Sequence, residues 1–207
     1  MTSIVAAISS AVIAIISAGG LPGIMLLMAL ESACIPIPSE IIMPFAGYLV
    51  SQGQFSLVAV ATFGAIGCNL GSAAAYLVGS RGGRTLVERW SRHSMFGVAE
   101  LRLAERFFQR FGPAATLVGR LLPVVRTFIA LPAGLARMNV WSFHAFTFVG
   151  SWIWCWALAY LGMTLGDRWQ DDPRLKTAFH VADVVVLLAL GALVVWYVVR
   201  RRRAERT

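Results

Sequence analysis

Residues 119–134 read GRLLPVVRTFIALPAG, and this stretch decides how the rest of the chain is interpreted. It is apolar enough to enter a lipid bilayer, yet it contains two prolines and two arginines, Arg120 and Arg126. A proline removes a backbone donor and interrupts a helix. Interrupted backbone at membrane depth is tolerated only where it is buried in protein or faces water. Residues 113–136 are therefore predicted to form a re-entrant hairpin, which enters the membrane, turns and leaves on the same side.

Residues 21–50 form a second apolar stretch of the same kind, and they carry two glutamates, Glu31 and Glu40, instead of arginines. We predict a second re-entrant hairpin here for the same reasons. The segment PFAGYL at 44–49 resembles LPAGLA at 131–136, so the two hairpins share a short local pattern. The residues predicted to break the hairpins are Pro36, Pro38, Pro44, Pro123 and Pro132.

The composition of the whole chain is that of an integral membrane protein. Of its 207 residues, 58% are hydrophobic and 14% are charged, whereas soluble domains average about 25% charged residues. A spanning helix needs about 20 apolar residues. The segments that meet or approach this requirement are residues 4–18, 56–79, 141–165 and 181–199. We therefore predict an all-α membrane protein with about four spans and two re-entrant hairpins, forming one membrane domain over residues 1–207.

The distribution of positive charge predicts the orientation, because cytoplasmic segments are enriched in arginine and lysine. The chain has 18 such residues and a formal net charge of +8. With the tail 200–207 in the cytoplasm, 13 of the 18 lie inside, three outside and two in the second hairpin. Residues 81–111 then form a cytoplasmic segment, part of which has the spacing of an amphipathic helix. Anionic lipid is the expected partner of this charge, and nucleic acid is not.

This orientation relates the two halves of the chain to one another. The first hairpin opens to the outside and is followed by a span, and the second hairpin opens to the cytoplasm and is followed by a span. An inverted repeat whose broken helices meet near the membrane midplane is typical of transporters with a central substrate site.

The four ionisable residues of the hairpins are the candidate site. A charge at bilayer depth costs about 2.5–3.5 kcal/mol even on the most lenient scale, so the two glutamates and two arginines are expected to compensate one another. Arg120 and Arg126 supply forked donors that suit a phosphate headgroup, and Glu31 and Glu40 can bind and release protons. One alternative is that buried ion pairs only hold the hairpins together. Another is that Glu40, with Ser39 as a cap, merely suits the start of a helix.

Other polar and small residues are expected to have structural roles. Asn69 is predicted to hydrogen-bond between helices, and the three cysteines are expected to be small buried hydrophobes. The glycines expected to allow close helix packing are Gly64, Gly67, Gly71 and Gly79. The tryptophans expected to face lipid are Trp141, Trp152, Trp154, Trp156 and Trp169. The sequence has no metal-ligand cluster, nucleotide-binding loop or nucleophilic triad, so no metal, cofactor or enzymatic activity is predicted.

At the hairpin motifs the sequence resembles the DedA family, also called the SNARE-associated or VTT-domain family. The resemblance rests on ESACIPIPSE at 31–40 with the following PFAG, and on the stretch 119–134, and it extends over about residues 21–166. It implies paired re-entrant hairpins in a bacterial inner membrane. It also implies a role in moving lipids, undecaprenyl phosphate in some members and phosphatidylethanolamine in others, with links to the proton motive force and to envelope stress.

Functional positions of the family carry over to Glu31, Arg120 and Arg126, while the second acid matches Glu40 at a different spacing from that in some members. The leading hypothesis is a proton-coupled flippase that recycles undecaprenyl phosphate across the inner membrane. The alternatives are a flippase or scramblase for phosphatidylethanolamine or another phospholipid, a cation–proton antiporter, and a purely structural membrane protein. The expected partners are lipids and protons. A homodimer is compatible with the sequence, which does not fix an oligomeric state.

Overall fold

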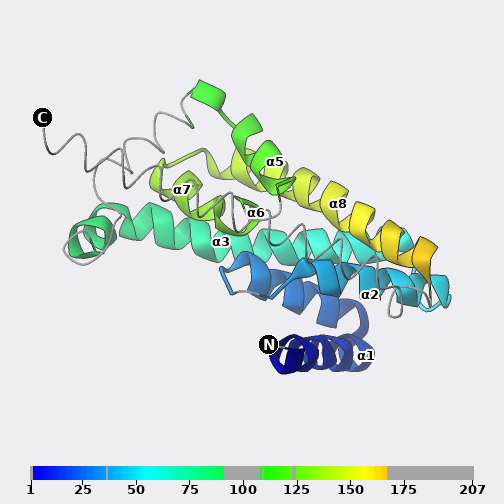
Figure 1. Ribbon diagram of the computed structural model, residues 1–207. Helices are drawn as coiled ribbons and strands as arrows, with labels where there is room; N and C mark the ends of the chain where they lie inside the picture. Colours follow the sequence, from blue (N-terminus) through cyan, green and yellow to red (C-terminus); the bar gives the residue numbers. More distant parts are fainter. Residues whose placement is uncertain (1, 36, 91–107, 109, 123–124, 167–207) are drawn as a thin grey trace, which may run out of the picture. The chain divides into compact units, whose positions relative to one another are not determined.

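The computed structural model describes residues 2–35, 37–90, 108, 110–122 and 125–166, and all regular structure in this part of the chain is helical (Figure 1). The helices are α1 (Thr2–Ser32), α2 (Ser39–Ser51), α3 (Leu57–Trp90), α5 (Ala114–Arg120), α6 (Val125–Phe128), α7 (Ala130–Leu135) and α8 (Val140–Leu165). The predicted span at 181–199, the basic tail, and most of the predicted amphipathic segment lie outside the described residues.

Helix α1 is one helical run with a sharp turn at Gly20. This residue has φ 55° and ψ −136°, a combination that residues with a side chain avoid. The chain on either side comes back into contact, because a Cβ placed on Gly23 would lie 2.6 Å from the carbonyl oxygen of Ile15. The predicted boundary between a first helix at 4–18 and the hairpin that follows lies at this turn, although no loop separates the two parts.

In the segment predicted as the first hairpin, α1 ends at Ser32 and α2, its second limb, begins at Ser39. Pro38 immediately precedes α2 with extended backbone, as expected of a residue that ends a break. Pro44, in contrast, lies inside α2 and Pro132 inside α7, so the prediction that these two prolines interrupt the chain is wrong. Pro44 removes one backbone hydrogen bond inside α2, and Pro132 lies in the first turn of α7, where a proline is tolerated. Pro36 and Pro123 lie outside the described residues.

The segment predicted as the second hairpin contains α5, which ends at Arg120, and then α6 and α7, which together form its second limb. Ile129, between α6 and α7, has helical angles of φ −58° and ψ −26°, so the limb is almost one helix. The thiol of Cys34 donates to the carbonyl oxygen of Thr127 at 3.6 Å. The break of the first hairpin therefore lies against the second hairpin.

Helices α3 and α8 form an antiparallel pair that runs through the described part (Figure 1). Hydrogen bonds join Thr62 to Trp152 and Asn69 to His144 across this pair. A third hydrogen bond joins Tyr76 of α3 to Met138, the residue before the N-cap of α8. The bond from Asn69 Nδ2 to the carbonyl oxygen of His144, at 3.0 Å, confirms the predicted interhelical role of Asn69. Helix α8 begins where the side chain of Asn139 accepts a bond from the backbone N–H of Ser142, an ordinary N-cap.

The α3 glycines allow the close packing that was predicted for them. A Cβ placed on Gly67 would lie 2.2 Å from the carbonyl oxygen of Met25, and one on Gly71 would lie 2.0 Å from that of Ala29. No side chain fits at such distances. Helices α1 and α3 therefore contact each other backbone to backbone, as small residues permit in membrane proteins.

The second limbs of the two hairpins pack on the α3–α8 pair in the same way. Helix α2 packs against α8. A Cβ placed on Gly47 of α2 would lie 1.9 Å from the carbonyl oxygen of Ala159 on α8, and one placed on Gly162 of α8 would lie 2.0 Å from that of Pro44 on α2. Helix α7 packs against α3. A Cβ placed on Gly134 of α7 would lie 2.3 Å from the carbonyl oxygen of Tyr76 on α3, and one placed on Gly79 of α3 would lie 2.5 Å from that of Leu131 on α7. Helix α2 thus packs near the C-terminal end of α8, and α7 near the opposite end of the antiparallel pair.

Three stretches are long and apolar enough to cross a membrane: Ser10–Ser32, Leu57–Gly82 and Val140–Leu165. The last two coincide with the predicted spans at 56–79 and 141–165, and the first contains the turn at Gly20. Within the described residues the chain is therefore an all-helical membrane protein.

Candidate functional site: a buried arginine–glutamate cluster

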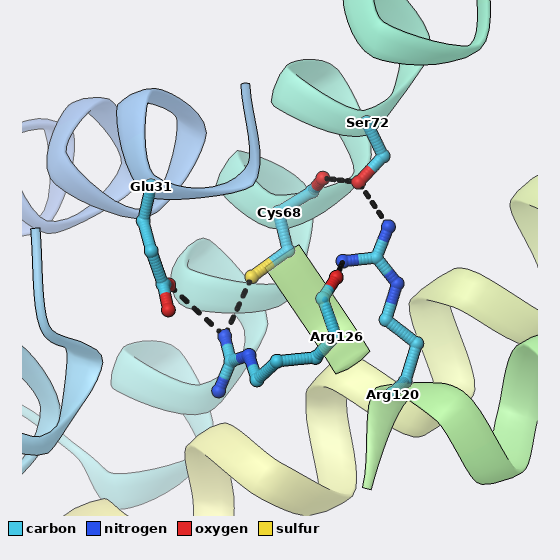
Figure 2. A network of polar contacts seen from close by, with 5 residues as sticks. All are labelled: Glu31, Cys68, Ser72, Arg120 and Arg126. Carbon is cyan, nitrogen blue, oxygen red and sulfur yellow. Dashed lines mark hydrogen bonds and ion pairs between the residues drawn. The ribbon is translucent and has the colours of Figure 1, made fainter. Parts of the chain in front are cut away.

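Glu31 and Arg126 form the single ion pair within the described residues. Glu31 lies at the end of α1 and Arg126 lies in α6, so the pair joins the two hairpins (Figure 2). The distance from Arg126 Nη2 to Glu31 Oε2 is 3.1 Å, and only 5% of Glu31 and 1% of Arg126 remain exposed. Two of the four ionisable residues identified in the sequence are thus in direct contact.

Arg120 lies in the same cluster but is bound to protein groups. Its Nη1 donates to the backbone carbonyl of Arg126 at 2.8 Å, and its Nη2 donates to the hydroxyl of Ser72 on α3 (Figure 2). That hydroxyl in turn donates to the carbonyl oxygen of Cys68. Arg120 is fully buried, and it fixes the backbone that carries Arg126 against α3.

Cys68 is a second contact of Arg126 on α3. Arg126 Nη2 lies 3.5 Å from Cys68 Sγ, and the cysteine is fully buried with a free thiol. The prediction of a small buried residue is confirmed in that respect, while the contact with a guanidinium was not foreseen. Cys68 and Ser72 are four residues apart, so they lie on the same face of α3.

The cluster carries more positive than negative charge. Two buried guanidinium groups, which stay protonated in proteins, accompany one buried carboxylate, that of Glu31, while Glu40 is only half-buried. Removing charges from water is costly, and attraction between partners repays the cost only when geometry and further hydrogen bonds are favourable. A surplus of buried positive charge therefore favours binding of an anion.

Helix α8 closes the cluster from another direction. The guanidinium carbon of Arg126 lies 5.1 Å from the ring centroid of Trp154, a cation–π contact. A Cβ placed on Gly150 would lie 2.7 Å from the Cβ of Arg120, so Arg120 passes directly over this glycine. Trp154, which was predicted to face lipid, is half-buried: its ring packs on Arg126 and its indole nitrogen is buried.

Glu40 does not join the ion pair. It is half-buried in the first turn of α2, and it forms no ion pair with the described residues. Ser39 does not cap the helix as expected, because Pro38 occupies the cap position and the buried Ser39 hydroxyl makes no hydrogen bond within the described part. The structure therefore brings Glu31, Arg120 and Arg126 together and leaves Glu40 beside them.

The described residues contain no group of three or more His, Cys, Asp or Glu side chains arranged to hold a metal ion. The cluster offers fixed positive charge, one buried carboxylate and unpaired hydrogen-bond donors.

Comparisons with known proteins agree with the motifs. Residues 37–164 match the family model of the VTT domain. The uncharacterized membrane protein YkoX of Bacillus subtilis is 34% identical over 89% of this chain and 80% of its own length. Undecaprenyl phosphate transporter A of the same organism is 29% identical over 81% of this chain and 84% of its own. Undecaprenyl phosphate transporter A of Staphylococcus aureus is 29% identical over 92% of this chain and 96% of its own.

No solved structure matches the chain significantly. The match to the VTT-domain model covers more than half of the chain and includes α2, α3, α5, α6, α7 and almost all of α8. This protein belongs to the VTT-domain family, the DedA family that its hairpin motifs resemble.

Proposed function

We propose that this protein moves a polyprenyl phosphate, such as undecaprenyl phosphate, across the bacterial cytoplasmic membrane. The observation that carries the proposal is the buried cluster of Arg120, Arg126 and Glu31, with two positive charges against one negative, beside the breaks of both hairpins. A phosphate monoester is the lipid headgroup that such a cluster suits best. Two relatives that carry the name undecaprenyl phosphate transporter A support this choice.

The packing of the hairpins supports an inverted repeat. The two second limbs make matching glycine contacts at opposite ends of an antiparallel helix pair, and Cys34 in the first break touches the second hairpin. Hairpins entering from opposite sides and meeting near the midplane would produce this arrangement. A headgroup held where they meet is then reachable from either leaflet by small movements of the hairpins.

Arg126 is the proposed ligand for the phosphate, and Arg120 holds it in place. A phosphate arriving at Arg126 would compete with the carboxylate of Glu31 for the same guanidinium. Two negative groups so close together repel, so binding is expected to be accompanied by uptake of a proton at Glu31. This exchange is the proposed route of proton coupling, with half-buried Glu40 as a site from which protons enter or leave.

The charge distribution of the sequence predicts a cytoplasmic C-terminal tail, and the proposal adopts this orientation. The proposal is tested by measuring undecaprenyl phosphate exposed at the surface of bacteria that lack the protein. Such cells should accumulate exposed carrier lipid, and wild-type protein should restore the normal level. Arg126→Gln should fail to restore it, whereas Arg81→Gln, which removes an exposed arginine near the end of the α3 span, should restore it. Normal exposure in the deleted cells would sink the proposal.

A further inference from the structure

Six buried side-chain atoms lack a hydrogen-bond partner within the described part of the chain, and every one of them can donate a proton. They are Ser39 Oγ, Arg120 Nε, Arg126 Nη1, Thr147 Oγ1, Ser151 Oγ and Trp154 Nε1. The guanidinium and indole nitrogens can only donate. No carboxylate or amide oxygen is among the six. What the buried cluster lacks is therefore an acceptor.

Three of these donors lie on one face of α8. Thr147, Ser151 and Trp154 are spaced four and three residues apart, so they share a helical face with Gly150. Gly150 is the residue over which Arg120 passes, and Trp154 is the residue on which Arg126 packs. The face that carries the unpaired donors is therefore the face turned toward both arginines.

The unpaired hydroxyls are unusual for an apolar helix. A Ser or Thr in a helix normally bonds to a carbonyl oxygen one turn earlier. Thr164 of α8 does so, donating to Leu161 at 2.9 Å, and Ser72 of α3 donates to Cys68. Thr147 and Ser151 make no such bond although 0% and 1% of them is exposed. A buried unpaired polar group costs stability, so a purely structural role does not account for these two hydroxyls.

We infer that Thr147, Ser151 and Trp154 bind the lipid headgroup together with Arg126 and select for a phosphate monoester. The inference rests on the proposed function and deepens it. At the charge of about −1.5 to −2 that it carries near neutrality, a phosphate monoester offers terminal oxygens that mainly accept hydrogen bonds, which matches a cluster of unpaired donors. A zwitterionic headgroup such as phosphoethanolamine brings an ammonium group that needs an acceptor. The buried carboxylate of the cluster, Glu31, is paired with Arg126 and Glu40 lies half-buried beside it, so the unpaired buried groups favour a headgroup that brings acceptors alone.

The experiment measures binding of farnesyl phosphate, a short polyprenyl phosphate, to the full-length protein in detergent. Farnesol and a short-chain phosphatidylethanolamine serve as comparison ligands. The variants are Thr147→Val and Ser151→Ala, which each remove a donor with little change of shape, and Trp154→Phe, which removes the indole donor together with part of the ring. The matched controls are Thr164→Val, whose hydroxyl already has a partner, and Trp156→Phe, whose exposed ring stacks on Tyr160.

Each α8 variant should bind farnesyl phosphate about tenfold more weakly, the effect of losing one bond to a charged group. Farnesol binding should stay within twofold, and the controls should match the wild type. The ligand-free Thr147→Val and Ser151→Ala variants should unfold at the same temperature as the wild type or higher, because each loses a buried hydroxyl without a partner. That readout separates headgroup binding from a structural role, which would lower the unfolding temperature.

If the wild type binds farnesyl phosphate and all three α8 variants bind it within twofold of the wild type, the inference is overturned. The proposed function is not contradicted by that result. Equal weakening for farnesyl phosphate and phosphatidylethanolamine would overturn the selective role. No binding of farnesyl phosphate by the wild type would overturn the proposed function, and the inference with it. If Trp154→Phe fails to fold, the two hydroxyl variants decide the matter.

Discussion

At the scale of single residues, the two arginines have the same charge but different surroundings. Arg120 uses both terminal nitrogens within the protein, on the carbonyl of Arg126 and the hydroxyl of Ser72. Arg126 uses one terminal nitrogen on Glu31 and Cys68 and leaves the other without a partner. We therefore assign Arg120 to positioning and Arg126 to binding.

Removing the charge of one partner of the buried ion pair should destabilise the protein. Glu31→Gln leaves Arg126 without its counterion, and the loss of a buried partner typically costs about 3–5 kcal/mol. Glu31→Gln combined with Arg126→Gln should recover most of this stability, because the buried charge that remains, that of Arg120, equals the surplus already present in the wild type. The free energy of unfolding in detergent measures both effects.

Transport should not recover together with stability in this double variant. The proposed ligand for the phosphate is absent, so carrier-lipid exposure in cells should resemble that of cells lacking the protein. Normal transport by the stable double variant would show that the ion pair only stabilises the contact between the hairpins and does not bind the headgroup.

Arg120→Lys tests the positioning role. A lysine has one terminal nitrogen and no fork, so it cannot hold the Arg126 carbonyl and the Ser72 hydroxyl with the same geometry. Transport should fall at least tenfold while the unfolding free energy falls by about 1–2 kcal/mol, the scale of one lost buried hydrogen bond. Ser72→Ala should give a smaller loss of transport in the same direction. Full activity of Arg120→Lys would contradict the assignment.

The sequence predicted the charged members of the site because a charge at bilayer depth is costly and therefore conspicuous. It did not predict Ser72, Thr147, Ser151 or the inward orientation of Trp154. Hydroxyls in apolar helices usually bond their own backbone, and a tryptophan is compatible with lipid contact on composition alone. Only the positions of the neighbouring helices show that these side chains lie at the arginine cluster.

At the scale of elements, the contacts between helices depend on glycines that face carbonyl groups. Gly67 and Gly71 bring α3 against α1, while Gly47 and Gly134 bring the hairpin limbs against α8 and α3. The sequence indicated the α3 glycines and the similarity of the two Ala-Gly segments. It predicted chain breaks at Pro44 and Pro132, which lie inside helices. The sequence alone does not distinguish a proline inside a helix from a proline at a break.

Replacing a packing glycine should force two backbones apart. Gly71→Ala and Gly134→Ala should each lower the unfolding free energy by about 1–3 kcal/mol, since overpacking in a close contact has this scale. Gly19→Ala is the matched control, because a Cβ there meets no atom within 4 Å. It should leave stability unchanged or raise it slightly through helix propensity. Equal effects at Gly19 and Gly71 would refute the close-packing account.

At the scale of the whole molecule, the proposed topology has hairpins open to opposite sides. Charge distribution predicts this orientation from sequence, and the packing of α2 and α7 at opposite ends of the α3–α8 pair is what it requires. The positions of the final predicted span and the basic tail rest on the sequence alone. The sequence predicts the spans and their orientation because composition and the positive-inside pattern depend on the lipid environment. It does not predict which helices pack together, because that depends on side-chain geometry.

Labelling of single cysteines in intact cells tests the topology. In a protein whose three cysteines are replaced, Gln54→Cys in the turn after α2 should react with a membrane-impermeant maleimide added outside. Arg110→Cys should react only after the membrane is permeabilised. Both positions are exposed on the protein surface. The opposite pattern would reverse the orientation, and labelling of both from outside would rule out hairpins that enter from opposite sides.

The central claim is that a guanidinium cluster built by two hairpins carries a phosphate headgroup across the membrane. The most direct test follows movement of a fluorescent polyprenyl phosphate between the leaflets of vesicles that contain the purified protein. The wild type and Arg81→Gln should speed this movement well above that in protein-free vesicles, and Arg126→Gln should leave it at the protein-free rate. Equal rates for Arg126→Gln and the wild type, or no acceleration by the wild type, would contradict the claim.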